Sequence, residues 1–185
     1  VDIARGLVWR HGVRDDGSLH LVRSYAIGEP VGAIAPIDGH DGWLLAPGRG
    51  FRLLDRDGTV RSLVDVAPAD ARMNDAVCDA AGRCWAGSLA DDHRVGGGAL
   101  HLLDVNGATR TVLDGLTVPY GIGWSPVGST MYLVDSVPGV IIAFDFDPRT
   151  ASISGGRDLV TFDAEDGVPD GLTIDRAGRL WAAIY

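Results

Sequence analysis

The sequence contains no lysine, so all 16 residues in its count of lysine and arginine are arginine. Its formal net charge is −9. The arginines are scattered singly, so the surface is not expected to attract nucleic acid. No apolar run approaches the roughly 18 residues that a membrane-spanning helix needs, and no basic segment precedes an apolar one at the start. The sequence therefore predicts neither nucleic acid nor a membrane as a partner.

Cysteine is scarce too, with Cys78 and Cys84 on either side of the segment DAAG. If residues 79–82 form a four-residue turn, Cys78 pairs with Arg83 across the hairpin and Cys84 points to the opposite face. A disulfide is then disfavoured, and a metal site needs more ligands than two thiols. We interpret the pair as two small buried thiols, which fits a reducing compartment and predicts a cytoplasmic protein.

Apolar residues are plentiful by contrast, at 46% of the 185 residues, which is enough to build a sizeable core. They occur in short runs bounded by Gly, Asp, Asn or Pro, and no helical period of 3.6 is evident. Such runs are typical of antiparallel strands joined by hairpins. The sequence predicts an all-β protein.

One local pattern recurs along the chain, a polar turn containing glycine followed by an aromatic residue and small or β-branched residues. It occurs in DGHDGWLLA, DAAGRCWAG, SPVGSTMYLVD and DRAGRLWAA. The aromatics are Trp43, Trp85, Tyr132 and Trp181, with spacings of 42, 47 and 49 residues. Four strands in each repeat of about 46 residues is typical of a β-propeller blade. The repeat therefore places Trp43, Trp85, Trp124 and Trp181 in blade cores rather than against a sugar.

The repeat also predicts where each blade lies. We expect whole four-stranded antiparallel blades over residues 32–66, 75–113 and 121–162, and partial blades over 1–25 and 171–185. Propellers close into a ring to protect their edges, and about three whole and two partial blades cannot do so neatly. We therefore expect residues 1–185 to be one truncated domain of a longer chain, which would need about 280 residues for six blades.

Polar residues recur just before the predicted innermost strand of each blade, which runs along the central channel. Asn74 and Asp75 precede AVCDA, Tyr120 lies 46 residues after Asn74, and Asp170 follows 50 residues later. Because these spacings are close to one repeat, we expect the side chains to meet at one channel mouth, together with Arg72. Their oxygen atoms suit a hard cation such as Ca²⁺ or Mg²⁺. The alternative is that these residues only form turns, as Asn-Asp and Asp-Gly pairs often do.

Several separate motifs resemble one known family. They are RMNDAVCDAAGRCWAGSLADD, GIGWSPVGSTMYLVDSVPGVIIAFDFDPRTASIS and GVPDGLTIDRAGRLWAAIY. They are similar to the senescence-marker-protein, gluconolactonase and luciferin-regenerating-enzyme family, which includes regucalcin. The likeness runs in order and with matching spacing through nearly the whole chain. It implies a six-bladed propeller and, commonly, divalent-metal-dependent hydrolysis of sugar lactones.

The resemblance also implies roles for individual residues. Asp170 matches an aspartate that binds the metal and acts as the general base. Arg72 and Asn74 match substrate contacts, and a further acidic substrate contact falls on Asp92. The asparagine ligand of the metal falls on Tyr120, and a glutamate ligand would lie before residue 1. A phenol with an ordinary pKa near ~10 is a weak ligand at neutral pH, so Tyr120 departs from the pattern.

The sequence thus predicts a metal-dependent hydrolase that acts on a small-molecule sugar or related lactone. A divalent cation, Ca²⁺ before Zn²⁺, Mg²⁺ or Mn²⁺, would polarise the carbonyl while Asp170 activates water. The alternative is a non-catalytic propeller that binds a small ligand or a protein partner and has a degenerate metal site, as Tyr120 indicates. A third hypothesis keeps the fold but assigns another reaction, because one fold hosts many chemistries.

Overall fold

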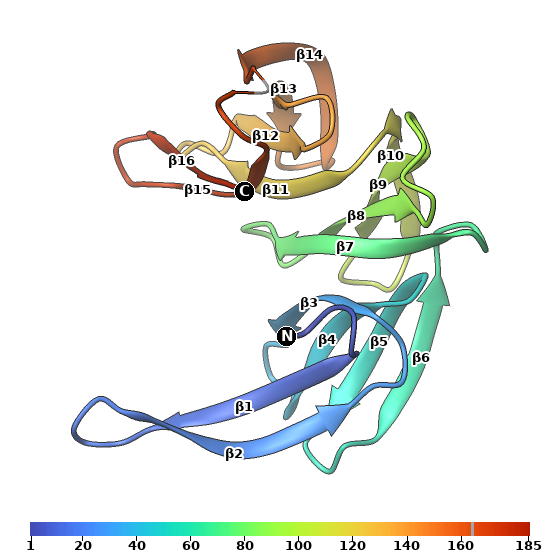
Figure 1. Cartoon of the computed structure of the whole chain (residues 1–185), viewed down its shortest axis with the longest axis vertical. Helices are drawn as coiled ribbons and strands as arrows, with labels where there is room; N and C mark the ends of the chain where they lie inside the picture. The colour runs from blue at the N-terminus through green and yellow to red at the C-terminus, as the bar shows by residue number, and fades with distance from the viewer. Residues whose placement is uncertain (164) are drawn as a thin grey trace.

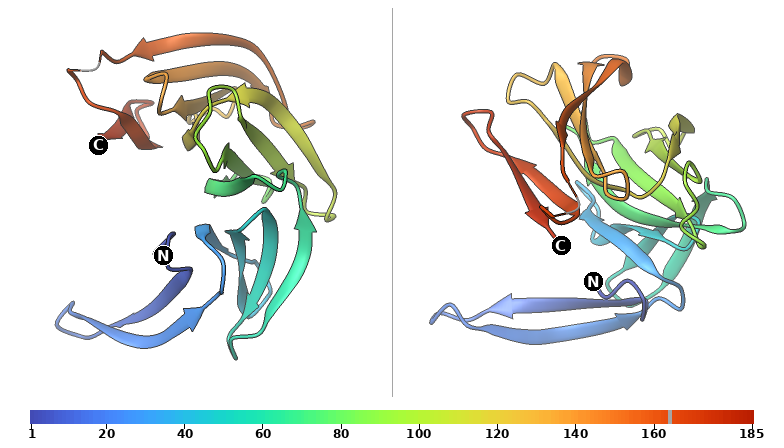
Figure 2. Two further views of the ribbon diagram at one scale, coloured as in Figure 1. Left: turned by 45° about the vertical axis from the view of Figure 1, so that its right-hand side comes forward. Right: turned by 45° about the horizontal axis from the view of Figure 1, so that its top comes forward.

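The structure, a computed structural model, describes residues 1–163 and 165–185, and these residues form β-strands and no helix. Three sheets have four strands and two have two, and within each sheet the strands that are consecutive in sequence pair antiparallel. Figure 2 shows the sheets arranged in an arc, with the two chain ends facing each other across its open side. Nothing helical in the described part is long and apolar enough to cross a membrane. The predicted all-β architecture of four-stranded blades is confirmed.

The strands follow the sequence order from sheet to sheet (Figure 1). The first sheet contains β1 (Leu7–Val13) and β2 (Leu19–Ala26). The second contains β3 (Val31–Pro36), β4 (Gly42–Pro47), β5 (Gly50–Asp55) and β6 (Val60–Asp65). The third contains β7 (Ala71–Cys78), β8 (Cys84–Ala90), β9 (Gly98–Leu103) and β10 (Thr109–Leu116). The fourth contains β11 (Pro119–Trp124), β12 (Thr130–Asp135), β13 (Val140–Asp147) and β14 (Ser152–Thr161), and the fifth β15 (Pro169–Ile174) and β16 (Leu180–Ile184).

Apolar side chains fill the spaces between successive sheets. Tyr25 belongs to a core shared by the first and second sheets, and Phe51 and Met73 to one shared by the second and third. Trp85 is fully buried between the third and fourth sheets, where its ring packs edge-on against Phe146 at 5.8 Å between centroids. Sheets packed face to face in this way are held by burial of apolar area, which is the main source of their stability.

The turn before the aromatic residue owes its stability to the aspartate of the repeated pattern. Asp79 accepts hydrogen bonds from Arg83 Nε at 2.7 Å and from Trp85 Nε1 at 3.0 Å, and from two backbone N–H groups of the turn. Asp175 accepts the same set from the turn that precedes Trp181, with 2.7 Å to Arg179 Nε. The sequence repeat is therefore also a repeat of hydrogen bonds. The fifth sheet has only one neighbouring sheet here, so Trp181 is 60% exposed, unlike the buried residue that we expected.

The first strands of four successive sheets, β3, β7, β11 and β15, lie next to one another and are called the inner strands. β3 contacts β7, β7 contacts β11, and β11 contacts β15. Glycine makes the approach possible at two places. A Cβ atom on Gly32 would collide with the Asn74 carbonyl group, and one on Gly121 with the backbone nitrogen of Leu172. The inner strands therefore come close enough to bring residues of different blades together.

The hairpin that carries the cysteines differs from the prediction. Asp79 N donates to Arg83 O at 2.9 Å, so the loop has three residues and Cys78 pairs with Cys84 rather than with Arg83. The two cysteines therefore lie on the same face of the sheet. Cys78 is exposed and Cys84 is buried, and both thiols are free. The predictions that their side chains point apart and that both are buried were wrong.

Candidate functional site

Each inner strand carries an irregularity at the same place near its start. The pairing register shifts beside Gly32, between Met73 and Ala76, between Pro119 and Ile122, and between Pro169 and Leu172. In the last three strands two residues face one residue of the neighbouring strand, as in a β-bulge, which redirects side chains. These residues are Asn74 and Asp75, Tyr120 and Gly121, and Asp170 and Gly171. The bulges thus present Asn74, Tyr120 and Asp170 at equivalent positions.

Arg72 and Asn74 form one unit at this mouth. Arg72 Nη1 donates to Asn74 Oδ1 and to the Met73 carbonyl oxygen, both at 3.1 Å. Asn74 is only 3% exposed, and its Nδ2 donates to the Pro119 carbonyl oxygen of the next inner strand at 3.0 Å. Burial lowers the pKa of Arg72, while the negative charge of Asp91 opposes this effect. Asn74 therefore ties β7 to β11 and holds the Arg72 guanidinium in a fixed orientation.

Tyr120, on β11, lies among charged groups of the two neighbouring inner strands, β7 and β15. Burial raises the pKa of its phenol, the charges of Asp170 and Asp75 raise it further, and Arg72 lowers it. The phenol therefore stays protonated at neutral pH and offers a neutral oxygen. Since Arg72, Asp75 and Asp170 all act on Tyr120, the structure brings the predicted residues Arg72, Asn74, Tyr120 and Asp170 close together, where we expected the channel mouth.

Asp75 was expected at the mouth together with Asn74, but the family resemblance assigned it no individual role. Its pKa is raised to about 6, first by burial and then by the negative charge of Asp170. Gly121 and Gly171 occupy the equivalent bulge positions, so Asp75 alone has a side chain there. Its place directly after Asn74 in RMND was the signal for that expectation, and the bulge explains how both residues stay near the mouth although side chains alternate along a regular strand.

The contacts of Asp92 are with Arg94 and not with Arg72 or Asn74. Its exposed carboxylate accepts from Arg94 Nη1 at 3.0 Å, and Arg94 also pairs with Asp70 at 2.8 Å. Asp91 is the acidic residue of this loop whose charge acts on Arg72. Asp91 is thus better placed than Asp92 to interact with the Arg72 guanidinium. The sequence alone does not resolve this difference of one position.

The donor chemistry of the mouth suits a hard divalent cation, since it consists of oxygen atoms. Asp75 and Asp170 repel each other across it, and a cation would neutralise that repulsion. The donor set is incomplete, because Tyr120 supplies only a neutral phenol oxygen. Among the described residues no group of three or more His, Cys, Asp or Glu side chains is placed to hold a metal ion. The oxygen ligands present are therefore of the type that a hard divalent cation prefers, but there are too few of them to complete its coordination.

The fold and this site define a β-propeller protein whose channel mouth holds carboxylates, an amide, a phenol and a guanidinium. The chain belongs to the SMP-30/Gluconolactonase/LRE-like family, whose region matches residues 1–185. The family resemblance read from the sequence is thereby confirmed.

Relatives and solved structures agree with this assignment. Regucalcin of Xenopus laevis is 31% identical over 180 residues, which cover 93% of this chain and 60% of its own. Pentonolactonase XacC of Haloferax volcanii is 32% identical over 146 residues, which cover 77% of this chain and 49% of its own. A luciferin-regenerating enzyme structure matches 100% of this chain and 64% of its own, with a TM-score of 0.89 and 27% identity. The chain thus spans between 49% and 64% of these proteins, and it matches six-bladed propeller structures over 64–65% of their length.

Proposed function

We propose that the whole protein hydrolyses a sugar lactone or a related lactone at the channel mouth. The observation that carries this proposal is the convergence of Asp170 with the Arg72–Asn74 unit, in a family whose relatives include a named pentonolactonase. A carboxylate and a fixed guanidinium, both close enough to act on Tyr120, supply the two elements that lactone hydrolysis needs from the protein. One accepts a proton from water, and the other binds the substrate oxygens.

Each residue of the mouth then has a distinct task. Asp170 takes the proton of the attacking water, since a carboxylate within reach of a bound water is a competent general base. Arg72 binds substrate hydroxyl or carbonyl oxygens, and Asn74 orients it by accepting its Nη1 hydrogen at 3.1 Å. A guanidinium held in advance loses less entropy when the substrate binds, so Asn74 is a positioning residue for Arg72.

A divalent cation, Ca²⁺ before Zn²⁺, Mg²⁺ or Mn²⁺, is part of the proposal. Asp170 is the residue that would hold it, with Tyr120 as a weak neutral donor. When bound, the cation would act as a Lewis acid on the carbonyl oxygen. Asp75 contributes negative charge that favours a cation at the mouth. The remaining oxygen ligands would be water molecules or oxygen atoms from other parts of the whole protein.

The test is a lactone panel assayed on the whole protein with and without EDTA. We expect Asp170→Asn to lower kcat/KM by about 10²–10⁴-fold, as removal of a general base does. The matched control is Asp145→Asn, a change of the same kind at an exposed pair with Arg157, which should leave the rate unchanged. Calorimetric titration with Ca²⁺ gives a readout that does not depend on turnover, and it should weaken in Asp170→Asn. Equal activity of wild type and Asp170→Asn would refute the mechanism.

The protonated phenol of Tyr120 favours a second candidate, a propeller that binds a small ligand or protein partner without turnover. A neutral phenol ligates hard cations weakly, so the cation site could be degenerate. In that case a lactone or sugar acid would protect the protein against thermal unfolding, with no hydrolysis at any cation concentration. Arg72→Ala should abolish such protection, whereas Asp170→Asn should leave it in place.

A further inference from the structure

Cys78 and Cys84 face each other directly across the hairpin of β7 and β8. The hydrogen bond from Asp79 N to Arg83 O closes the hairpin just beyond them, so they occupy a non-hydrogen-bonded pair. At such pairs the Cα atoms are about 4.5 Å apart and the side chains are at their closest. This separation lies within the range that disulfides span, so a bond between the two sulfurs requires no backbone movement.

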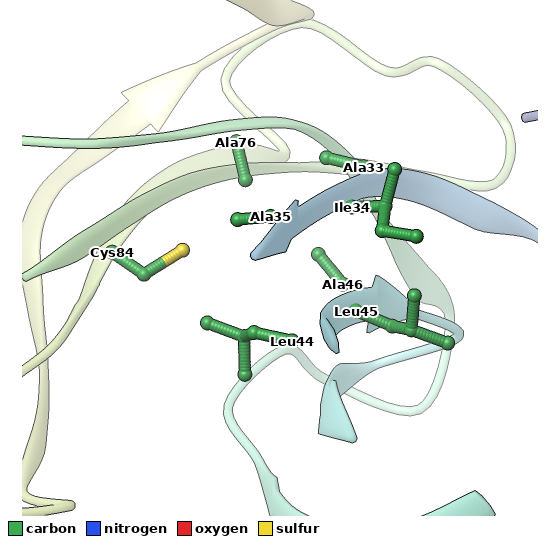
Figure 3. Close-up of a pocket in the computed structure, with 8 residues that line it drawn as sticks. All are labelled: Ala33, Ile34, Ala35, Leu44, Leu45, Ala46, Ala76 and Cys84. Atoms are coloured by element: carbon green, nitrogen blue, oxygen red, sulfur yellow. The ribbon is translucent and has the colours of Figure 1, made fainter. Parts of the chain in front are cut away.

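The two thiols differ in access. Cys78 is exposed, whereas Cys84 is 4% exposed. Both line a groove of about 700 Å³ between the second and third sheets, whose other walls include Leu44, Leu63 and Leu103. Figure 3 shows the Cys84 sulfur directed toward Ala35 of the neighbouring sheet. A small molecule in the groove can therefore reach Cys78 first, and Cys84 lies behind it.

The two thiols also differ in acidity. A hydrogen bond from the Cys84 thiol lowers the pKa of Cys78, and that bond and burial raise the pKa of Cys84. The thiolate is the nucleophile in thiol–disulfide exchange, so the more accessible sulfur is also the more reactive one. Access and acidity thus assign the attacking role to Cys78 and the second, resolving role to Cys84.

We propose that Cys78 and Cys84 form a thiol–disulfide exchange site that reacts with low-molecular-weight disulfides and closes into an intrachain disulfide. The Cys78 thiolate attacks one sulfur of the disulfide R–S–S–R, forms a mixed disulfide and releases RS⁻, which takes up a proton. The Cys84 thiol then loses its proton and attacks the Cys78 sulfur, which releases the second RSH. In sum, two protein thiols are oxidised while one small disulfide is reduced to two thiols.

This site is separate from the Arg72–Asn74 unit, because it lies at the opposite end of β7. Arg72 and Asn74 belong to the start of this strand, and Cys78 is its last residue. The new bond would join β7 to β8 across the hairpin only, within the third sheet. The redox state of the pair can therefore be tested whether or not the protein has lactonase activity.

The experiment is to incubate the native chain with glutathione disulfide, block the remaining thiols and digest with trypsin. The chain has no lysine, and Arg72, Arg83 and Arg94 place the two cysteines in separate peptides, 73–83 and 84–94. We expect these peptides to be recovered joined by a disulfide, with a loss of two hydrogen atoms from the intact mass and full reversal by dithiothreitol. Recovery of the two peptides unlinked, or of a mixed disulfide that never resolves, would overturn the proposal.

Two variants separate the roles of the cysteines. Cys84→Ala should accumulate the mixed disulfide on Cys78, because no second thiol can displace it. Cys78→Ala should react at least ten times more slowly than Cys84→Ala with a thiol reagent, since Cys84 is buried. Equal rates for the two variants would refute the assigned roles. The wild-type peptide map decides the main question even if either variant fails to fold.

Discussion

The buried ion pair of the third sheet allows a sharp test of how the repeated turn stabilises the fold. Asp79 and Arg83 have side-chain exposures of 2% and 8%, and their Oδ2 and Nε atoms are 2.7 Å apart. Asp79→Ala removes one partner and leaves the guanidinium buried, with only the Pro148 carbonyl at 2.8 Å to accept from it. Breaking a buried pair in this way costs about 3–5 kcal/mol, because the remaining charge is desolvated and unpaired.

The equivalent turn of the fifth sheet provides the matched control. Asp175 and Arg179 have the same 2.7 Å contact, but their side chains are 26% and 73% exposed. Water can replace the lost carboxylate at an exposed pair, so Asp175→Ala should reduce the free energy of unfolding of the 185-residue chain much less than Asp79→Ala does. The same chemical change in the same motif is thus expected to have different effects, and the difference comes from burial alone.

Equilibrium unfolding in urea measures both changes, with intrinsic tryptophan fluorescence as the signal. The double variant Asp79→Ala/Arg83→Met should recover part of the loss, because it removes the unpaired charge and keeps the packing of the stem. If Asp79→Ala and Asp175→Ala reduce the free energy of unfolding equally, burial does not set the strength of this pair. The reasoning would also fail if the double variant were less stable than Asp79→Ala.

Three further predictions follow from the structure. Burial lowers the pKa of His101 from 6.5 to about 4. The unfolded chain therefore binds a proton that the folded chain excludes. Between pH 6.5 and pH 4 the wild type should lose up to about 3 kcal/mol of stability relative to His101→Gln in urea titrations, a comparison that cancels the opposite effect of the raised pKa of Asp75. Gly121→Ala should destabilise by about 1–3 kcal/mol because its Cβ meets the Leu172 backbone, whereas Gly171→Ala, with only Tyr120 at 3.9 Å, should be tolerated in thermal unfolding. Tyr120→Asn should tighten Ca²⁺ binding in calorimetry, because an amide oxygen is a better hard-cation ligand than a neutral phenol; unchanged affinity would place the cation elsewhere.

Local chemistry accounts for the parts of the fold that could be predicted from sequence. The turns around Asp79 and Asp175 are built from residues within six positions of each other, so a repeated sequence pattern produced a repeated hydrogen-bond pattern. Alternating apolar residues and turn signals likewise indicated antiparallel strands in blades. The equivalence of Asn74, Tyr120 and Asp170 followed from their spacing alone, because each bulge lies at the same point of its repeat.

Long-range packing accounts for the rest. The approach of neighbouring inner strands, and the bulges they carry, decided that Asp75 is buried with a raised pKa and that Asp91, rather than Asp92, acts on Arg72. A loop shorter by one residue than predicted turned Cys84 to the same face as Cys78, since side chains alternate between faces with every step along a strand. The sequence by itself therefore determined the repeat, the order of the strands and the candidate residues. Only the tertiary structure decided which side chains meet, because contacts between sheets depend on register and burial that no local pattern encodes.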